Sequence, residues 1–249
     1  MGKIIVNADD FGISSQVNSA IVQGIRRGLI DRATLIVNMD HTKDAVEIAK
    51  EYSIENRIGL HLNICEGIPL TEPIKKTIFC HENGAFCEST LKITKNRLYL
   101  DNKNRRALEI ELRAQIEKYL SFGFQLKHVD SHEHTHTSIS VWNVLEPLLL
   151  EYRMRTARLS RNIPESSIKG FNRIYKKYIN HKISAFNGNK TEIDKFGSQD
   201  DVTKFLQEQT SFSGIELMIH PIMKDGKIVD IFNMIDIETW KKQHCIGDK

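Results

Sequence analysis

Residues 3–28 read KIIVNADDFGISSQVNSAIVQGIRRG and combine a strand pattern with a helix pattern. The stretch opens with a nearly continuous apolar run, as in a strand that is buried on both faces of a parallel sheet. A helix pattern begins at Ser14 or Ser15, either of which can cap a helix N-terminus, and it ends near the closing glycine. Asp9 and Asp10 follow the strand directly. The stretch therefore predicts one β–α unit that carries two carboxylates at the carboxyl end of its strand.

The same alternation of strand and helix patterns continues along most of the chain. Further strand patterns lie at residues 33–37, 57–64, 126–129, 156–160 and 215–219. Helix patterns lie at 43–52, 104–122, 141–152, 164–185, 200–210 and 236–243. Repeated β–α alternation predicts a parallel sheet with right-handed crossovers. At 249 residues the chain has the usual length of an α/β barrel, which predicts one domain over residues 1–249.

Residues 66–103 interrupt the alternation. Pro69, Pro73 and the turn sequence at 82–84 break every regular period. We expect a long excursion that contains a hairpin around this turn. Because long loops on a barrel commonly carry binding residues, the excursion is expected to form the substrate rim or a lid.

Residue types that bind metals follow the ends of four predicted strands. Beside Asp9 and Asp10, the third strand ends near His61, residues 128–137 read HVDSHEHTHT, and His220 follows the last strand. A barrel gathers the carboxyl ends of its strands at one face, so these groups are expected to converge. One aspartate and two histidines would leave coordination positions open for water and substrate. The pattern predicts metal-assisted hydrolysis of an amide, ester or phosphoester, without choosing among the three.

The backbone of residues 128–137 decides which of its side chains meet. In an extended segment alternate side chains point to one side, here those of Asp130, His132, His134 and His136. In a helix every fourth residue shares a face, here His128, His132 and His136. The flanking patterns favour a short strand that runs into a loop.

Two of the candidate residues have a simpler structural explanation when each is taken alone. Asp10 could cap the first helix or close a turn at Gly12. A lone histidine inside an apolar strand, such as His61, is more often a satisfied core residue than a ligand. The convergence with the other strand ends favours a metal-binding role for both.

The composition argues against several classes of protein. A net charge of +3 gives little support for a polyanionic partner, and the absence of any run of about 18 apolar residues excludes a membrane-spanning helix. The first strand begins almost at the N-terminus, so we expect no signal peptide. Four cysteines without a C-x-x-C pair indicate free thiols in a reducing cytoplasm. Cys80 and His81 with Cys87 could bind zinc, but their spacing matches no strong pattern.

Several blocks of the sequence occur in the order of one known family. They are NADDFG at 7–12, GLHLN at 59–63, GIPL at 67–70, HVDSHEHTH at 128–136, Arg158 and IHP at 219–221. Together they resemble the YdjC-like carbohydrate deacetylases, which include chitooligosaccharide deacetylases. The resemblance implies a distorted (β/α) barrel of the polysaccharide-deacetylase type, similar to a TIM barrel. It also implies one divalent metal ion, magnesium or zinc, and release of acetate from an N-acetylated sugar.

The same resemblance implies roles for individual residues. The metal ligands of the family match Asp10, His61 and His132. Its catalytic groups match Asp9 as general base, His220 as acid and Arg158 as the residue that orients a carboxylate. Asp130 would hold a ligand histidine in one tautomer. The family usually has a proline soon after the histidine cluster, but residues 137–140 contain none, which leaves His134 and His136 as either supporting or substrate-binding groups.

Two other functions fit parts of the sequence. A phosphoesterase on a similar barrel could use arginines and lysines between residues 153 and 177, but two-metal phosphatases need more carboxylates than these strand ends supply. A module that binds nucleic acid could use the basic segment 153–182, but a solvated helix face explains that segment more simply. We therefore expect a saccharide substrate and neither nucleic acid nor membrane as a partner, and the family habit suggests a homodimer.

Overall fold

The computed structural model describes residues 2–164, 168, 170–208 and 212–244. Its main feature is a seven-stranded sheet in the order β5-β4-β3-β2-β1-β7-β6, in which every pair of neighbours is parallel. The strands are β1 (Lys3–Phe11), β2 (Arg32–Ile36), β3 (Ile58–Leu62), β4 (His128–Ser131), β5 (Thr156–Ala157), β6 (Lys195–Ser198) and β7 (Gly214–Ile219). The prediction of a parallel sheet is confirmed.

β1 lies at the centre of this sheet. It pairs with β7 from Lys3 opposite Gly214 to Ala8 opposite Ile219, and it pairs with β2 on its other edge. Val6 and Ala8 are fully buried, in keeping with the apolar run of the sequence. The first strand therefore carries its two terminal carboxylates into the middle of the fold.

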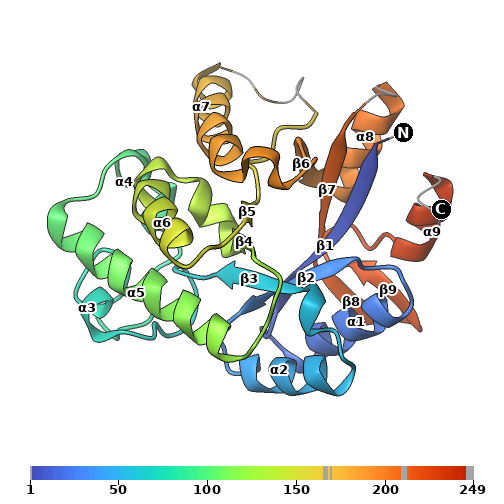
Figure 1. Cartoon of the computed structure of the whole chain (residues 1–249), viewed down its shortest axis with the longest axis horizontal. Helices are drawn as coiled ribbons and strands as arrows, with labels where there is room; N and C mark the ends of the chain where they lie inside the picture. The colour runs from blue at the N-terminus through green and yellow to red at the C-terminus, as the bar shows by residue number, and fades with distance from the viewer. Residues whose placement is uncertain (1, 165–167, 169, 209–211, 245–249) are drawn as a thin grey trace.

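The sheet curls into a distorted (β/α) barrel that no β-ladder closes within the described residues (Figure 1). β5 and β6 are its two edges. The N–H of Asn162 donates to the carbonyl oxygen of Phe196 at 3.2 Å, and the N–H of Phe196 donates to Asn162 Oδ1 at 2.8 Å. Asn162, which follows β5, thus connects the two edges of the sheet by hydrogen bonds where no strands pair. The predicted distorted barrel is confirmed.

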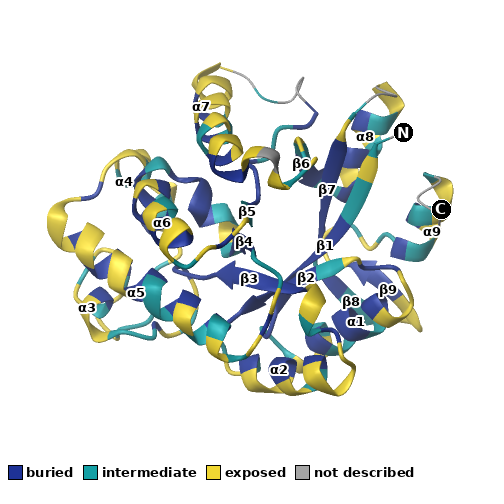
Figure 2. Cartoon of the chain, viewed as in Figure 1, coloured by how far each residue is buried: buried dark blue, intermediate teal, exposed yellow. Residues whose placement is uncertain are grey.

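Helices connect most of the consecutive strands and cover the outside of the sheet. They are α1 (Ser15–Arg26), α2 (Thr42–Glu51), α5 (Asn102–Ser121), α6 (Ile139–Glu151), α7 (Gly170–Asn187), α8 (Gln199–Glu208) and α9 (Ile237–Gln243). Figure 2 shows exposed helix faces turned away from strands that are buried over most of their length. The start of α1 follows its prediction, because Ser14 Oγ accepts a hydrogen bond from the N–H of Val17 at 3.2 Å. No helix in the described part of the chain is long and apolar enough to cross a membrane.

Residues 66–103 form an excursion without a long element. It contains two short helices, α3 (Glu72–Lys75) and α4 (Thr94–Leu98), and a 3-10 turn at Thr90–Lys92. The predicted hairpin is confirmed as a single antiparallel bridge between Cys80 and Phe86. Glu111 of α5 holds the start of the excursion, since its carboxylate accepts hydrogen bonds from the backbone N–H groups of Leu70 and Thr71 at 3.0 and 2.9 Å.

Three strands of the structure were not predicted from the sequence. β6 is a four-residue strand with one large apolar side chain, so its sequence has no strand pattern. The strand is stabilised by its pairing with β7. The hairpin of β8 (Pro221–Lys224) and β9 (Lys227–Asp230) follows His220. Asp225 and Gly226 form its turn with positive φ angles of 49° and 74°. An Asp-Gly pair is a typical signal for such a tight hairpin, so this turn was a sign of the two strands that the prediction overlooked.

Several predicted boundaries were wrong. The fourth strand, expected at 126–129, is β4 at His128–Ser131, and the fifth, expected at 156–160, ends at Ala157. The helix expected at 164–185 begins at Gly170 instead, since residues 164 and 168 are not helical, and residues 165–167 and 169 lie outside the described residues. The helix expected at 200–210 is α8, which begins one residue earlier and reaches Glu208; residues 209 and 210 are not described.

Candidate metal and catalytic site

Both carboxylates of the adjacent pair Asp9 and Asp10 reach one cavity because β1 is irregular where they lie. The register of β1 against β2 shifts between Ala8 and Phe11, and Asp10 has a φ of 65°, in the left-handed region. In a regular strand, neighbouring side chains point to opposite faces, whereas a bulge redirects a side chain. As a result, Asp9 and Asp10 both line the cavity described below.

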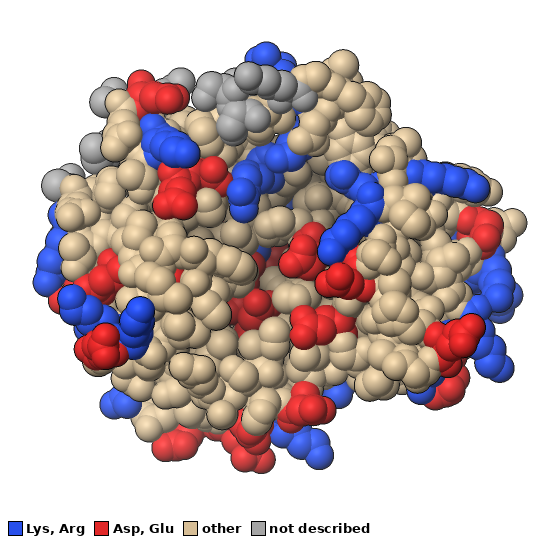
Figure 3. All heavy atoms as spheres, turned by 180° about the vertical axis from the view of Figure 1, so that it is seen from behind, with Lys and Arg blue, Asp and Glu red and all other residues tan. Residues whose placement is uncertain are grey.

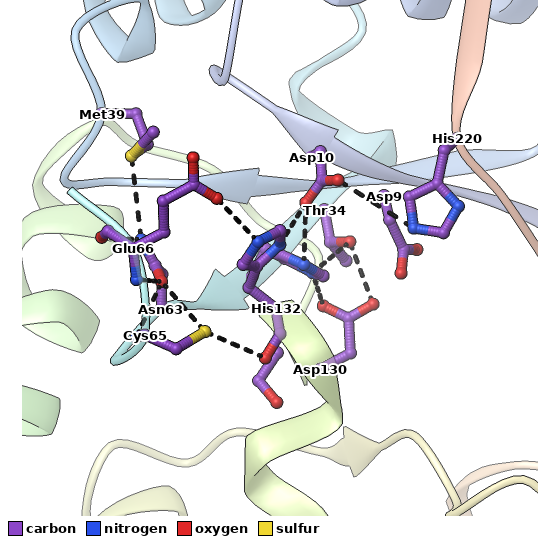
Figure 4. A network of polar contacts seen from close by, with 12 residues as sticks. Asp9, Asp10, Thr34, Met39, Asn63, Cys65, Glu66, Asp130, His132 and His220 are labelled. Carbon is purple, nitrogen blue, oxygen red and sulfur yellow. Dashed lines mark hydrogen bonds and ion pairs between the residues drawn. The ribbon is translucent and has the colours of Figure 1, made fainter. Parts of the chain in front are cut away.

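Asp10, His61 and His132 form a compact group at the carboxyl end of the sheet, and Figure 4 shows Asp10 beside His132. Asp10 Oδ1 lies 3.3 Å from His61 Nε2 and 2.8 Å from His132 Nδ1. One potential ligand atom of each residue lies within 4.8 Å of the others. The residues come from β1, from β3 and from the 3-10 segment His132–Thr137 that follows β4. The group could hold a metal ion.

Asp130 orients His61 from behind this group. Its Oδ1 lies 2.6 Å from His61 Nδ1, and the hydroxyl of Thr34 donates to its Oδ2 at 3.0 Å. Because Nδ1 of His61 is bound to a carboxylate, its Nε2 is left to face Asp10. A carboxylate in this position is the usual partner of a metal-binding imidazole.

The electrostatics of the group favour a cation. Burial lowers the pKa of His61, but the carboxylates of Asp130 and Asp10 outweigh it and raise this pKa to about 10. Burial also raises the pKa of Asp10, yet the hydrogen bonds with His132 and His61 hold it well below its usual value. The carboxylates therefore stabilise positive charge here, which a divalent ion would also provide. Imidazole and carboxylate are donors that such an ion accepts, so the residues fit a metal.

Arg158 is a buried cation that binds three carboxylates. Its Nη1 and Nη2 donate to the two oxygens of Asp9 at 2.5 and 2.7 Å. Its Nη2 also lies 2.6 Å from Asp130 Oδ2, and its Nε donates to Glu216 at 2.6 Å. Burial lowers the pKa of Arg158, but these carboxylates raise it well above the usual value. The guanidinium is therefore charged inside the barrel, and it binds both carboxylate oxygens of Asp9.

A second arginine extends this network along the barrel interior. Arg32 Nη2 lies 2.7 Å from Glu216 Oε2 and 3.1 Å from His128 Nε2. Among the described residues there are two other groups of potential metal ligands, and both include Asp130. Each contains a carboxylate that is already paired with Arg158, so the group around Asp10 is the better candidate for a metal.

A cavity of about 410 Å³ opens over the candidate metal group. Its carboxylates come from Asp9, Asp10, Glu133, Asp200 and Asp230. Arg161 is the cation in its described lining, and its Nε lies 3.2 Å from Asp201. On the face shown in Figure 3, acidic side chains gather around a central hollow, with basic side chains above it. The cavity is therefore acidic, which suits a cation at its floor.

His220 also lines the cavity, close to Asp10 of the candidate metal group. Its Nε2 is 4.0 Å from Asp10 Oδ2, and its Nδ1 is buried without a hydrogen-bond partner among the described residues. The ring packs edge-on against Phe232 at 4.7 Å between ring centres. Its backbone N–H donates to Asp230 Oδ2 at 3.0 Å, so the unpredicted β8–β9 hairpin holds this histidine in place.

His134 and His136 do not belong to the candidate metal group. His134 has a φ of 53°, lines the cavity and packs edge-on against Phe196, and its Nδ1 has no partner within the described structure. His136 lies behind the cavity, where Ser131 Oγ is 2.6 Å from its Nδ1 and its Nε2 donates to the carbonyl of Arg158 at 2.9 Å. Burial lowers the pKa of His136 to about 4. The strand expected here ends at Ser131, and His132, His134 and His136 lie in the following segment, whose 3-10 turns are interrupted by left-handed backbone at Glu133 and His134.

The structure brings most of the predicted residues to the cavity. Its lining includes Asp9, Asp10, His61, His132, His134 and His220, whereas Asp130, His136 and Arg158 lie behind it. Sequence reasoning missed Glu66, whose Oε2 is 3.0 Å from His132 Nε2, and it missed Glu216. Glu216 lies inside the apolar run of β7, and a buried carboxylate needs a charged or hydrogen-bonding partner, so its position was a signal in the sequence. Glu66 gave no such signal, because it lies in an irregular segment.

Comparison with known proteins agrees with this geometry. The model of the family described as YdjC-like protein matches residues 3–244. The chain belongs to the YdjC-like family. A carbohydrate deacetylase of Clostridium beijerinckii is 34% identical over 233 residues, which cover 91% of this chain and 84% of that protein. A carbohydrate deacetylase of Vibrio cholerae is 32% identical over 228 residues, covering 90% and 79% of the two chains.

A solved structure also matches this YdjC-like chain. It is a crystal structure from Enterococcus faecalis V583 described as a candidate cellobiose-phosphate cleavage protein. It covers 90% of this chain, with a TM-score of 0.68 and 20% sequence identity. At this level of identity the likeness supports the shared barrel fold alone.

Proposed function

We propose that this chain is a metal-dependent carbohydrate deacetylase, which hydrolyses the amide of an N-acetylated sugar to acetate and an amine. One observation carries the proposal: the Asp10–His61–His132 group opens on the same cavity as Asp9 and His220. The relatives named as carbohydrate deacetylases support the reaction class. The phosphoesterase alternative gains no support from an acidic cavity, which would repel a phosphate ester.

Asp10, His61 and His132 would hold one divalent ion. When bound, such an ion polarises the amide carbonyl and lowers the pKa of a water molecule. Magnesium and zinc are the ions to test first. Two imidazoles and one carboxylate are a typical zinc set, whereas magnesium would keep more water molecules.

Asp9 would act as the general base. Arg158 and Asn7 fix its carboxylate, with Asn7 Nδ2 donating to Oδ1 at 2.8 Å. The carboxylate would accept the proton of the attacking water, and Arg158 would keep it oriented through the reaction. A base that is held in one orientation loses little entropy when the substrate binds.

His220 would act as the general acid. Phe232 packs edge-on against its ring and Asp230 holds its backbone, so the imidazole faces the cavity in a defined orientation. Its proton would pass to the nitrogen of the sugar as the C–N bond breaks, which releases a neutral amine. The acid and the base would then act from opposite sides of the scissile amide.

The surroundings of this site would select the substrate. We propose that residues 66–103 form its rim, because Glu66 at the start of this excursion contacts His132, although the described lining of the cavity itself comes from other segments. We also propose that His134, which lines the cavity, contacts the sugar. Asp130 and His136 would support the groups in front of them. We further propose a cytoplasmic setting, which the free thiols of Cys65, Cys80 and Cys87 support, and the family resemblance suggests a homodimer.

The test is acetate release from a panel of N-acetylated mono- and disaccharides. The purified protein is treated with a chelator, and zinc, magnesium, manganese or cobalt is then added back. We expect acetate release that stops with the chelator and returns with one of these ions. Release that is insensitive to the chelator would exclude the metal role, and turnover of phosphate esters without any acetate would replace the deacetylase proposal with the phosphoesterase one.

A further inference from the structure

Glu66 contacts His132 on the side opposite Asp10 (Figure 4). His132 Nε2 is 3.0 Å from Glu66 Oε2, while its Nδ1 is 2.8 Å from Asp10 Oδ1. A neutral imidazole carries one proton, so one nitrogen donates a hydrogen bond and the other is available to a metal. The two carboxylates therefore decide between two tautomers of His132.

His61 has the same arrangement with its two nitrogens exchanged. Its Nδ1 is 2.6 Å from Asp130 Oδ1, and its Nε2 is 3.3 Å from Asp10 Oδ1. In both histidines one nitrogen faces Asp10 and the other faces a second carboxylate, which is buried in the case of Asp130 and exposed in the case of Glu66. Asp130 therefore binds the nitrogen of His61 that does not face Asp10, and Glu66 binds the corresponding nitrogen of His132.

We propose that Glu66 is a positioning residue of the metal site, which accepts a hydrogen bond from Nε2–H of His132 and leaves Nδ1 facing Asp10. The inference rests on the proposed function, because it concerns the same site. A carboxylate behind a ligand histidine fixes its tautomer and its ring orientation, and it raises the basicity of the ligand nitrogen. Loss of Glu66 should therefore weaken metal binding without removing a ligand.

The backbone that carries Glu66 is held firmly by Asn63. Oδ1 of Asn63 accepts from the N–H groups of Cys65 and Glu66 at 3.2 and 3.1 Å, and its Nδ2 donates to the carbonyl of Glu66 at 2.8 Å. Gln115 of α5 binds both the N–H and the carbonyl of Asn63, at 3.0 and 2.7 Å. The carboxylate of Glu66 thus extends from a turn whose backbone is fixed by hydrogen bonds, as a positioning group requires.

The position of Glu66 gives this contact a second consequence. Its side chain is 52% exposed, whereas that of His132 is 14% exposed, so Glu66 lies on the solvent side of the histidine. Glu66 is also the first residue of the 66–103 excursion. The contact therefore connects the proposed substrate rim to the candidate metal group.

The first experiment measures cobalt(II) binding to the full chain by its visible absorption. Wild type is compared with Glu66→Gln, which keeps an acceptor oxygen without its charge, and with Glu66→Ala, which keeps neither. Glu82→Ala is the control, since Glu82 is exposed on the turn of the same excursion. We expect Glu66→Ala to bind cobalt about 10- to 100-fold more weakly than wild type, with Glu66→Gln between them and the control unchanged.

The second experiment reads the tautomers directly. Histidine ¹⁵N shifts of the zinc-loaded protein should place a proton on Nε2 of His132 and on Nδ1 of His61. In Glu66→Ala the Nε2–H signal of His132 should shift or exchange rapidly with water. A zinc-bound Nε2 on His132 would overturn the inference.

The outcomes separate this inference from the proposed function. Equal cobalt affinity of wild type and Glu66→Ala would overturn the role of Glu66 and leave the metal site standing. Failure of wild type to bind any cobalt would overturn both. The metal-free proteins should melt at the same temperature, and a lower melting temperature of Glu66→Ala would assign Glu66 a purely structural role instead.

Discussion

Asp9 and Arg158 form a two-point ion pair across the barrel, with the guanidinium nitrogens 2.5 and 2.7 Å from the two carboxylate oxygens. Asp9 lies at the end of the first strand, and Arg158 follows directly after β5 at one edge of the sheet. Arg158 also binds Asp130, the residue behind His61. One buried cation thus sets the positions of the proposed base and of a proposed ligand.

Replacement of Asp9 by asparagine tests the proposed base. Asparagine keeps the shape but cannot take up a proton, so we expect acetate release to fall about 100-fold or more. Metal content should stay at the wild-type level, because the proposed metal ligand of this carboxylate pair is Asp10 and not Asp9. Asp44→Asn, at an exposed position of α2, serves as the control. Unchanged turnover in Asp9→Asn would exclude Asp9 as the base.

Replacement of His132 by alanine tests the metal group. The variant lacks one of three ligands, so we expect metal to be lost on dialysis and acetate release to disappear with it. Metal content by elemental analysis is the measurement, and His181→Ala, at an exposed position of α7, is the comparison. If His132→Ala retained one equivalent of metal, the ligand assignment would be wrong.

The network around Glu216 predicts loss of stability in acid. Burial raises the pKa of Glu216, but Arg32 and Arg158 outweigh it and hold this pKa well below the usual value. The unfolded chain therefore binds the proton more readily than the folded protein. The resulting stabilisation is complete above the ordinary glutamate pKa of about 4.3 and is lost as the pH falls below it.

Glu216→Gln isolates this effect. The variant leaves Arg32 without its buried partner charge and removes one of the three carboxylates that bind Arg158. We therefore expect its free energy of unfolding at pH 7 to fall by about 3–5 kcal/mol. Its stability should also decline less steeply than that of wild type between pH 5 and pH 3. Urea unfolding at a series of pH values measures both quantities. Parallel pH profiles of the two proteins would refute the role of Glu216.

Gly12 predicts a local requirement next to the site. It has a φ of 99°, and an added Cβ would lie 2.9 Å from the carbonyl oxygen of Ile36. Gly12→Ala should therefore lower the free energy of unfolding by about 1–3 kcal/mol and weaken metal binding, since Asp10 lies two residues earlier. Gly28→Ala is the matched control, because Gly28 also has a positive φ, of 70°, but an added Cβ would meet nothing within 4 Å. Equal destabilisation of the two variants would show that the backbone conformation alone, and not the contact with Ile36, sets the cost.

The parallel barrel was predictable because its signals are local. Apolar runs of strand length, helix periodicity and capping serines depend on neighbouring residues, and Ser14 caps α1 as expected. The gathering of Asp10, His61 and His132 followed from one topological rule, since parallel strands end at one face. The β8–β9 hairpin was also within reach of the sequence through its Asp225-Gly226 turn.

The sequence by itself therefore determined the fold class and the residue types at the mouth of the barrel. Only the tertiary structure decided their partners: Arg158 with three carboxylates, Glu66 with His132, and the β8–β9 hairpin under His220. These pairs are separated by up to 149 residues, and no periodic pattern connects them. Their geometry depends on a bulge in β1, a 3-10 turn after β4 and the curl of the sheet. Such features arise from packing between distant segments, so the patterns within short stretches of sequence do not predict them.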